Sequence, residues 1–122
     1  MIGIDLVFLP RFRNILMGRF GEKFCKLIYT KSELESAAPL CQNERIRFLA
    51  GRFAAKESAI KASMGKLSLK SIGKMEVRQQ TAGNIEIFLI GEKMINKFGD
   101  ASISHDEDNV VAVVIRDANS SC

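Results

Sequence analysis

The sequence predicts an α+β fold in a single compact domain covering residues 1–122. A length of 122 residues with 47% hydrophobic residues suits one domain with one core. Segments of strand and helix character do not alternate regularly, which favours α+β over a doubly wound parallel sheet. Two runs near the end, 101–105 and 109–116, predict a closing hairpin over Asp106-Glu107-Asp108.

The first third of the chain predicts one strand and two helical segments. Residues 2–9, IGIDLVFL, predict a buried strand, because they are apolar, partly β-branched and without helical spacing. Pro10 ends this strand, since proline cannot donate a hydrogen bond to a neighbouring strand. Residues 12–18 and 20–29 predict helix.

A capping motif and a long apolar stripe predict the next two helices. Thr30-Lys31-Ser32-Glu33 fits a capping box, so a short helix is expected to start near Ser32 and to close at Pro39. Residues 44–64 are rich in alanine and predict the longest helix, with Gly65 just past its end. Its expected apolar stripe is Leu49, Phe53, Ile60 and Met64.

The last third predicts a hairpin and another helix before the closing hairpin. Residues 72–79 and 84–90 predict strands around a turn at Ala82-Gly83-Asn84. Residues 91–98 predict a short helix that stops at Gly99.

Composition excludes several classes of protein. No apolar stretch approaches the length of a membrane span, and the N-terminus lacks the basic region of a signal peptide. We therefore expect a soluble, cytoplasmic protein. The cysteines are odd in number and form no CxxC pair, so free thiols are expected and a zinc site or disulfide framework is not. These cysteines are Cys25, Cys41 and Cys122.

The charge is concentrated in the middle of the chain. Residues 44–80 carry nine basic and three acidic residues, a local net charge of +6, whereas the whole chain carries +4. A basic segment suits an anionic partner such as nucleic acid, a phosphate ester or an acidic protein, although a solvated helix face has the same composition. One tyrosine and no tryptophan argue against a base-stacking surface.

Asp5 lies in the middle of the apolar strand predicted over residues 2–9. A carboxylate there needs a partner or a bound cation, because desolvation of an unpaired charge is costly. It is either a ligand for a hard metal ion or a base, or else it forms a salt bridge, caps a backbone group or faces solvent. The strand alone leaves these alternatives open.

Glu57 precedes Lys61 by one turn of the predicted 44–64 helix, a spacing common for surface ion pairs. Other cations share the helix. Mg²⁺ typically uses one or two protein carboxylates, and nearby cations neutralise the phosphates that complete such a site. A magnesium and phosphate site is therefore the alternative to a surface pair. The other cations considered are Arg45, Arg52 and Lys56.

Two further residues have both a structural and a functional interpretation. His105 ends a predicted strand, and it is either a solvated or core histidine or a phosphate contact or acid–base group. Glu33 is explained by the capping box alone, but it is also a candidate carboxylate.

Three segments, taken in order, form a recognisable set. The first is Gly3-Ile4-Asp5 followed by Arg11, and the second is residues 51–62, GRFAAKESAIKA. The third is Ser102-Ile103-Ser104-His105 before the apolar strand 110–115. Together they resemble the signature motifs of the 4′-phosphopantetheinyl transferases. The short length is similar to that of the small bacterial, holo-[acyl-carrier-protein] synthase type. The resemblance covers nearly the whole chain and implies an antiparallel sheet wrapped on a long helix.

The resemblance also implies an activity. Members of this family transfer phosphopantetheine from coenzyme A to a serine of apo acyl carrier protein, release adenosine 3′,5′-bisphosphate and serve fatty acid biosynthesis. By position, Asp5 and Glu57 match the ligands of Mg²⁺, for which Mn²⁺ is a possible substitute. Lys61 completes the expected catalytic set, and Glu33 is a candidate for an assisting carboxylate.

The remaining expected roles concern coenzyme A, the carrier protein and assembly. Small family members are typically homotrimers that bind coenzyme A between neighbouring chains. Two other functions are alternatives. A small nucleic-acid-binding module explains only the basic segment, and the intact Asp5, Glu57 and Lys61 argue against a non-catalytic trimeric scaffold. The residues that match coenzyme A contacts are Arg45, Arg52, Lys61 and His105, and those that match the docking surface are Arg11, Arg19 and Lys23.

Overall fold

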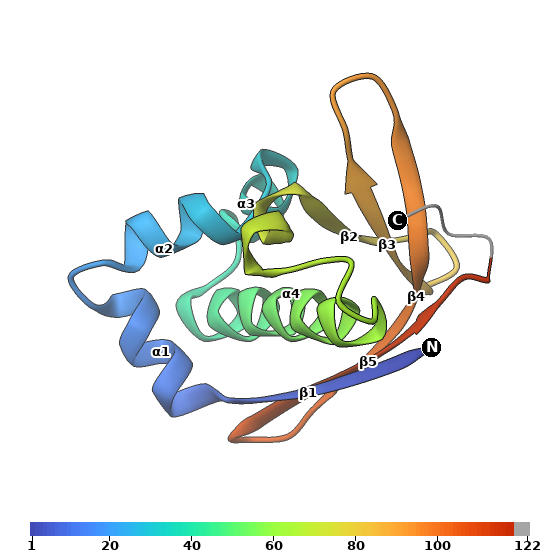
Figure 1. The fold of residues 1–122 in the computed structure, drawn as a ribbon. Coiled ribbons are helices and arrows are strands. Elements are labelled where there is room, and N and C mark those ends of the chain that lie inside the picture. The colour runs from blue at the N-terminus through green and yellow to red at the C-terminus, as the bar shows by residue number, and fades with distance from the viewer. Residues whose placement is uncertain (119–122) are drawn as a thin grey trace.

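The computed structural model describes residues 1–118 and confirms the α+β class. Five antiparallel strands form one sheet in the order β1-β5-β4-β3-β2 (Figure 1). The first strand of the chain therefore pairs with the last, in the register Asp5 opposite Ala112. The strands are β1 (Ile2–Phe8), β2 (Met75–Gln79), β3 (Ile85–Ile90), β4 (Ile95–His105) and β5 (Asn109–Arg116).

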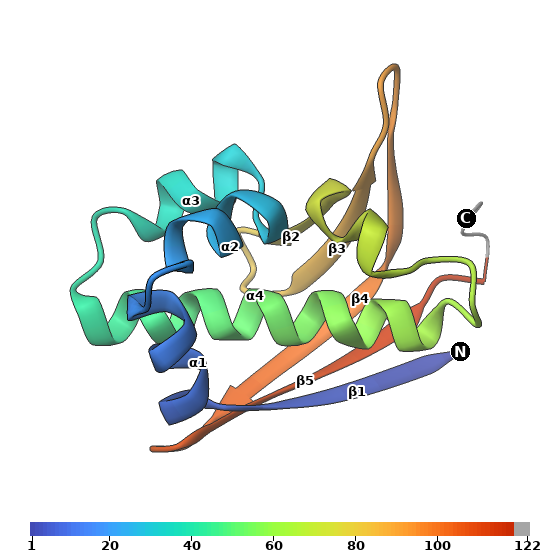
Figure 2. The ribbon, with the colours of Figure 1, turned by 60° about the vertical axis from the view of Figure 1, so that its left-hand side comes forward.

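The long helix α4 (Gln42–Ala62) lies at the centre of the molecule. The shorter helices are α1 (Leu9–Met17), α2 (Gly21–Ile28), α3 (Lys31–Ala37) and a 3₁₀ helix (Leu69–Lys74). One side of α4 packs on β1, β5 and β4, whereas α2, α3, the 3₁₀ helix and β2 lie on its other side and α1 lies beside its N-terminal half (Figures 1 and 2). None of the helices in the described part of the chain is long and apolar enough to span a membrane.

Small residues let α4 pack closely on several sides. The predicted stripe is only partly correct, because Leu49 is buried but Met64 lies past the helix end and is 68% exposed. Met64 and Gly65 both have positive φ, 56° and 86°, so the chain turns sharply after the helix. The helical alanines that are buried to 1% exposure or less are Ala50, Ala54, Ala55, Ala59 and Ala62.

Gly3 allows β1 to lie directly against α4. A Cβ atom at Gly3 would lie 1.9 Å from the backbone oxygen of Ser58, a distance that no side chain tolerates. The Ser58 Oγ atom lies 2.9 Å from the Ala112 carbonyl oxygen of β5, to which it can donate a hydrogen bond. The glycine of the Gly3-Ile4-Asp5 motif is therefore required for the close approach of the strand that carries Asp5 to the helix that carries Glu57.

The helix predicted over 91–98 is wrong. The Gly91 N–H donates to the Met94 carbonyl (2.9 Å), which closes a turn, and β4 then starts at Ile95. The register shifts by one residue opposite Ile87 and Phe88, so that β4 carries a bulge at Phe98. The bulge breaks the alternation of apolar residues in β4, so the strand lacks the pattern that would have revealed it.

Two smaller differences concern residues 72–74 and the cysteines. Residues 72–74, predicted as part of a strand, belong to the 3₁₀ helix, and β2 begins at Met75. Cys25 and Cys41 are free, as expected. Cys122 lies outside the described residues.

Candidate active site

Asp5 and Lys61 form an ion pair between β1 and α4. The Lys61 Nζ atom lies 3.1 Å from Asp5 Oδ1 and donates to the Ile4 carbonyl oxygen at 2.8 Å. The side chain of Asp5 is 18% exposed, so its carboxylate is largely removed from water. Of the alternatives open for Asp5, the salt bridge is therefore present, and its partner is the lysine that the sequence placed beside Glu57.

Glu57 faces the same cleft as Asp5. The two carboxylates and Arg11 line a cleft of about 260 Å³, whose apolar wall includes Phe12 and Phe53. Burial and the negative charge of Asp5 raise the pKa of the Glu57 carboxyl, and the positive charge of Lys61 opposes this rise. Two carboxylates that repel each other in one cleft are typical of a functional site, because stability alone does not favour such an arrangement.

The donor set in this cleft fits a hard divalent cation. Asp5 and Glu57 supply carboxylate oxygens, which Mg²⁺ prefers, and a cation between them would relieve their repulsion. Within residues 1–118 no group of three or more His, Cys, Asp or Glu side chains could hold a metal. Two protein carboxylates suffice for Mg²⁺, which leaves most of its coordination positions to water and phosphate.

A second, cationic cleft of about 240 Å³ lies between α4 and β4. Arg52 packs against Phe48, with its Cζ atom 3.8 Å from the ring centroid, and burial lowers the pKa of its guanidinium group. His105 lines the cleft from the end of β4, and Arg47 lines it from α4. The Nε atoms of Arg47 and Arg52 are buried without a hydrogen-bond partner in the described chain, and both residues line the cleft, where a guanidinium group can bind an anion. No sequence motif identifies Arg47 as a site residue.

The comparisons with known proteins decide the family. The model of the 4′-phosphopantetheinyl transferase superfamily matches residues 1–115. The chain belongs to this superfamily. It is thus a phosphopantetheinyl transferase, as its motifs predicted, and the two clefts lie within the matched residues.

Named relatives and solved structures agree with this assignment. The transferase is 40% identical over 121 residues to the holo-[acyl-carrier-protein] synthase of Carboxydothermus hydrogenoformans, covering 93% of this chain and 94% of that one. It is 36% identical over 117 residues to the corresponding protein of Wolbachia pipientis wMel, covering 93% and 90%.

Two crystal structures resemble the fold closely. The synthase of Bacillus anthracis in complex with CoA (3′,5′-ADP) has a TM-score of 0.76 and 33% identity, covering 94% of this chain and 93% of that one. The Helicobacter pylori synthase in complex with coenzyme A has the same TM-score and 30% identity, covering 96% and 100%.

Arg45, Glu33 and Lys61 are expected catalytic or coenzyme A residues that line neither cleft of the transferase, although Lys61 pairs with Asp5 of the first cleft. Arg45 does not line either cleft, and its positive charge acts on the half-buried Cys25 thiol, opposing the rise in pKa that burial causes. Glu33 is buried, and both of its oxygens have partners: Lys56 and the Thr30 amide at Oε1, and the Val77 amide at Oε2. The catalytic role of Glu33 stays a prediction, and these contacts favour a structural role.

The expected docking residues lie on and beside α1 and α2. Arg11 lines the cleft of Asp5 and Glu57, which we call the carboxylate cleft. Arg19 and Lys23 are exposed farther along the chain. Exposed apolar side chains accompany them, including Met17 (56% exposed) and Phe20 (66%). We call the surface formed by Arg11, Met17, Arg19, Phe20 and Lys23 the docking surface.

Proposed function

We propose that this transferase moves the 4′-phosphopantetheine group from coenzyme A to a serine of apo acyl carrier protein in a Mg²⁺-dependent reaction. The by-product is adenosine 3′,5′-bisphosphate. The observation that carries the proposal is the carboxylate cleft, where Asp5, Glu57 and Arg11 lie together in a chain of this family. The chain acts as one domain in the cytoplasm, and its product serves fatty acid biosynthesis.

The reaction needs charge neutralisation, in-line positioning and a proton acceptor. The serine oxygen forms a bond to the β-phosphorus, and the bond from that phosphorus to the bridging oxygen breaks. Asp5 and Glu57 would hold the cation, and Mg²⁺, or Mn²⁺ in its place, would neutralise the charge of the pyrophosphate when bound. Lys61, 3.1 Å from Asp5, can donate to a phosphate oxygen. A carboxylate of the cleft, directly or through a water it orients, accepts the serine proton.

The two clefts have different roles in this proposal. The carboxylate cleft takes the pyrophosphate and the cation, whereas Arg52 and His105 of the cationic cleft take the remaining phosphate of coenzyme A. The two clefts have no lining residue in common, so they are separate features of one chain.

An uncovered apolar sheet face supports a homotrimer with shared sites. On β1, Ile2, Ile4 and Leu6 alternate with the residues that face α4, and they are 66%, 58% and 65% exposed. Their partners on β5 are Ile115, Val113 and Val111, so the apolar surface continues across both strands. A second copy of the chain is the occupant we propose, because bound coenzyme A would join the carboxylate cleft of one copy to the cationic cleft of another. Light scattering that finds an active monomer at micromolar concentration would contradict shared sites.

Mass spectrometry tests the transfer itself. The protein is incubated with coenzyme A, Mg²⁺ and apo acyl carrier protein, and the carrier is expected to gain one phosphopantetheine at one serine. A chelator should prevent the gain and added Mg²⁺ should restore it. A carrier protein of unchanged mass, with a protein that is folded and supplied with Mg²⁺, would contradict the proposed function.

A further inference from the structure

Lys56 is a fully buried charged residue that the proposed chemistry does not use. It precedes Glu57 on α4 and is 0% exposed. Its Nζ atom donates to Glu33 Oε1 at 2.6 Å and to the Ile28 carbonyl oxygen at 2.6 Å, and it lies 5.3 Å from the centroid of the Tyr29 ring. A buried ammonium group persists only where partners compensate its desolvation, and these contacts supply them.

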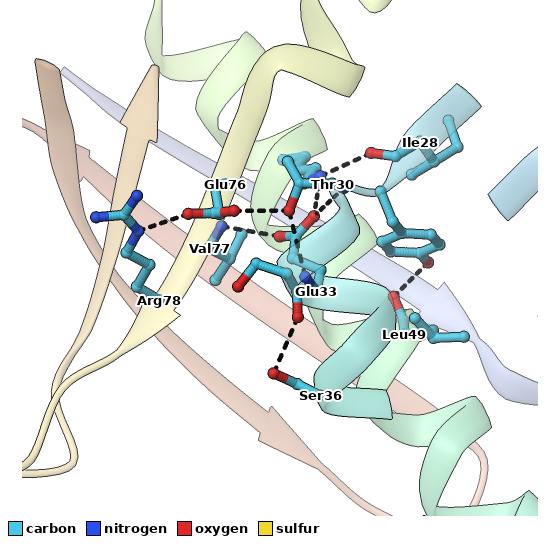
Figure 3. Close-up of polar contacts among 11 residues, drawn as sticks. Ile28, Thr30, Glu33, Ser36, Leu49, Glu76, Val77 and Arg78 are labelled. Atoms are coloured by element: carbon cyan, nitrogen blue, oxygen red, sulfur yellow. Dashed lines mark hydrogen bonds and ion pairs between the residues drawn. The ribbon is translucent and has the colours of Figure 1, made fainter. Parts of the chain in front are cut away.

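The surrounding network fixes Glu33 from several elements (Figure 3). Glu33 belongs to α3 and accepts from the Thr30 amide at 2.9 Å and from the Val77 amide of β2 at 2.8 Å. The Thr30 hydroxyl donates to Glu76 at 2.7 Å, and Glu76 pairs with Arg78 at 2.6 Å. The negative end of the network is thus held by α3 and β2 independently of Lys56.

The contact to Ile28 joins Lys56 to a different part of the molecule. Ile28 is the last residue of α2, so its carbonyl is one of the helix-terminal acceptors that lack a partner within the helix. The same α2 carries Lys23 of the docking surface. One side chain therefore connects the helix that presents Glu57 to the helix that presents part of the docking surface.

We propose that Lys56 is a positioning residue that fixes α2, and with it Lys23 of the docking surface, relative to Glu57. This inference rests on the proposed function, because it concerns the carrier protein that docks there. The carboxylate cleft is held by separate contacts, namely the close approach of Gly3 to Ser58 and the ion pair of Lys61 with Asp5. Loss of Lys56 is therefore expected to affect the carrier protein and not coenzyme A.

Three variants separate positioning from charge balance. Lys56→Met alone leaves the buried Glu33 uncompensated, and this variant is expected to lose stability. Glu33→Gln keeps Lys56 as a donor to the Ile28 carbonyl oxygen but leaves its buried charge unpaired, so it is also expected to lose stability and serves as the matched control when it is shown to be folded. The double variant K56M/E33Q removes both buried charges and also the contact to Ile28. The comparison of the double variant with Glu33→Gln therefore isolates that contact.

The readouts are KM for each substrate and amide hydrogen exchange of residues 21–28. For K56M/E33Q we expect the carrier-protein KM to rise about tenfold relative to Glu33→Gln, as for loss of one hydrogen bond from a charged donor. The KM for coenzyme A should stay within about twofold, since the cleft keeps its own contacts. Exchange in α2 should become faster while exchange at the centre of β5 is unchanged.

Several outcomes would overturn the positioning role. A folded double variant with the carrier KM and α2 exchange of Glu33→Gln would show that Lys56 only balances the charge of Glu33. A double variant that fails to fold would show that Lys56 holds the whole chain rather than α2. Absence of transfer by the unmodified protein would instead contradict the proposed function. Faster amide exchange of α2 in the double variant would still support the positioning of α2 by Lys56.

Discussion

Lys56 and Glu57 are neighbours on α4, yet they have opposite environments. Lys56 points to the side of α2 and α3, is completely buried and donates two hydrogen bonds of 2.6 Å. Glu57 lines an open cleft, where burial and the charge of Asp5 raise its pKa. One residue further along an α-helix is a rotation of about 100°. A satisfied buried charge organises the fold, whereas a carboxylate held near another carboxylate is available for chemistry.

Substitution of Gly3 should cause the largest loss of stability, because Gly3 lies where β1 packs directly on α4. In Gly3→Ala the new Cβ would lie 1.9 Å from the Ser58 oxygen, so β1 must move away from the helix. We expect a loss of about 3 kcal/mol or more in the free energy of unfolding, as for severe overpacking. Urea denaturation measures it. Gly51→Ala is the control, since its Cβ would meet side chains and no backbone, Ile103 at 3.3 Å and Val110 at 3.8 Å, and should cost far less.

Removal of the cleft carboxylates should abolish activity and spare the fold. Glu57→Gln and Asp5→Asn keep the side-chain shape but remove a negative charge from the proposed metal site. We expect transfer to fall about a hundredfold or more in each variant, comparable to loss of a key electrostatic group. The midpoint of thermal unfolding should change little in Glu57→Gln, because this substitution also relieves repulsion with Asp5. Near-normal turnover at limiting Mg²⁺ in either variant would remove the metal assignment.

A smaller effect is expected on the buried side of α4. The Tyr29 hydroxyl donates to the Leu49 carbonyl oxygen at 2.6 Å in the core. Tyr29→Phe should therefore cost about 1 kcal/mol of stability, with kcat unchanged. Chemical denaturation and steady-state kinetics measure the two quantities. A large loss of kcat without loss of stability would show that this side of the helix contributes directly to catalysis.

The smallest effect is expected on the exposed docking surface. The double variant R19E/K23E reverses two charges that an acidic carrier protein would meet. The carrier KM should rise several-fold at low salt and less at high salt, because exposed charges act mainly on association and are screened. The KM for coenzyme A is the internal control and should not move. A carrier KM within error of the unmodified protein at low salt would place docking elsewhere on the chain.

The order of elements was largely predictable from sequence, because apolar patterning and capping act locally. The capping box at Thr30 and Glu33 forms as predicted, with both reciprocal hydrogen bonds present. The strand at residues 95–98 could not be found, because the bulge at Phe98 depends on pairing with β3. A register shift between strands leaves no local signal.

The site was predictable in part. The motifs placed Asp5, Glu57 and Lys61 together, and the structure brings all three to one junction of β1 and α4. The pairing of Lys61 with Asp5 instead of Glu57 could not be foreseen, because it depends on the approach of β1 that Gly3 allows. The burial of Glu33 against Lys56 likewise joins residues 23 positions apart, which only the tertiary fold reveals.

Direct measurement of cation binding tests the central claim that Asp5 and Glu57 form the metal site. Free Mn²⁺ is followed by electron paramagnetic resonance as the protein is titrated in the presence of coenzyme A. We expect one Mn²⁺ per chain to lose its free signal, Mg²⁺ to compete for it, and Glu57→Gln to weaken binding about tenfold or more. Equal Mn²⁺ affinity in the unmodified protein and in the folded Glu57→Gln and Asp5→Asn variants would contradict the claim.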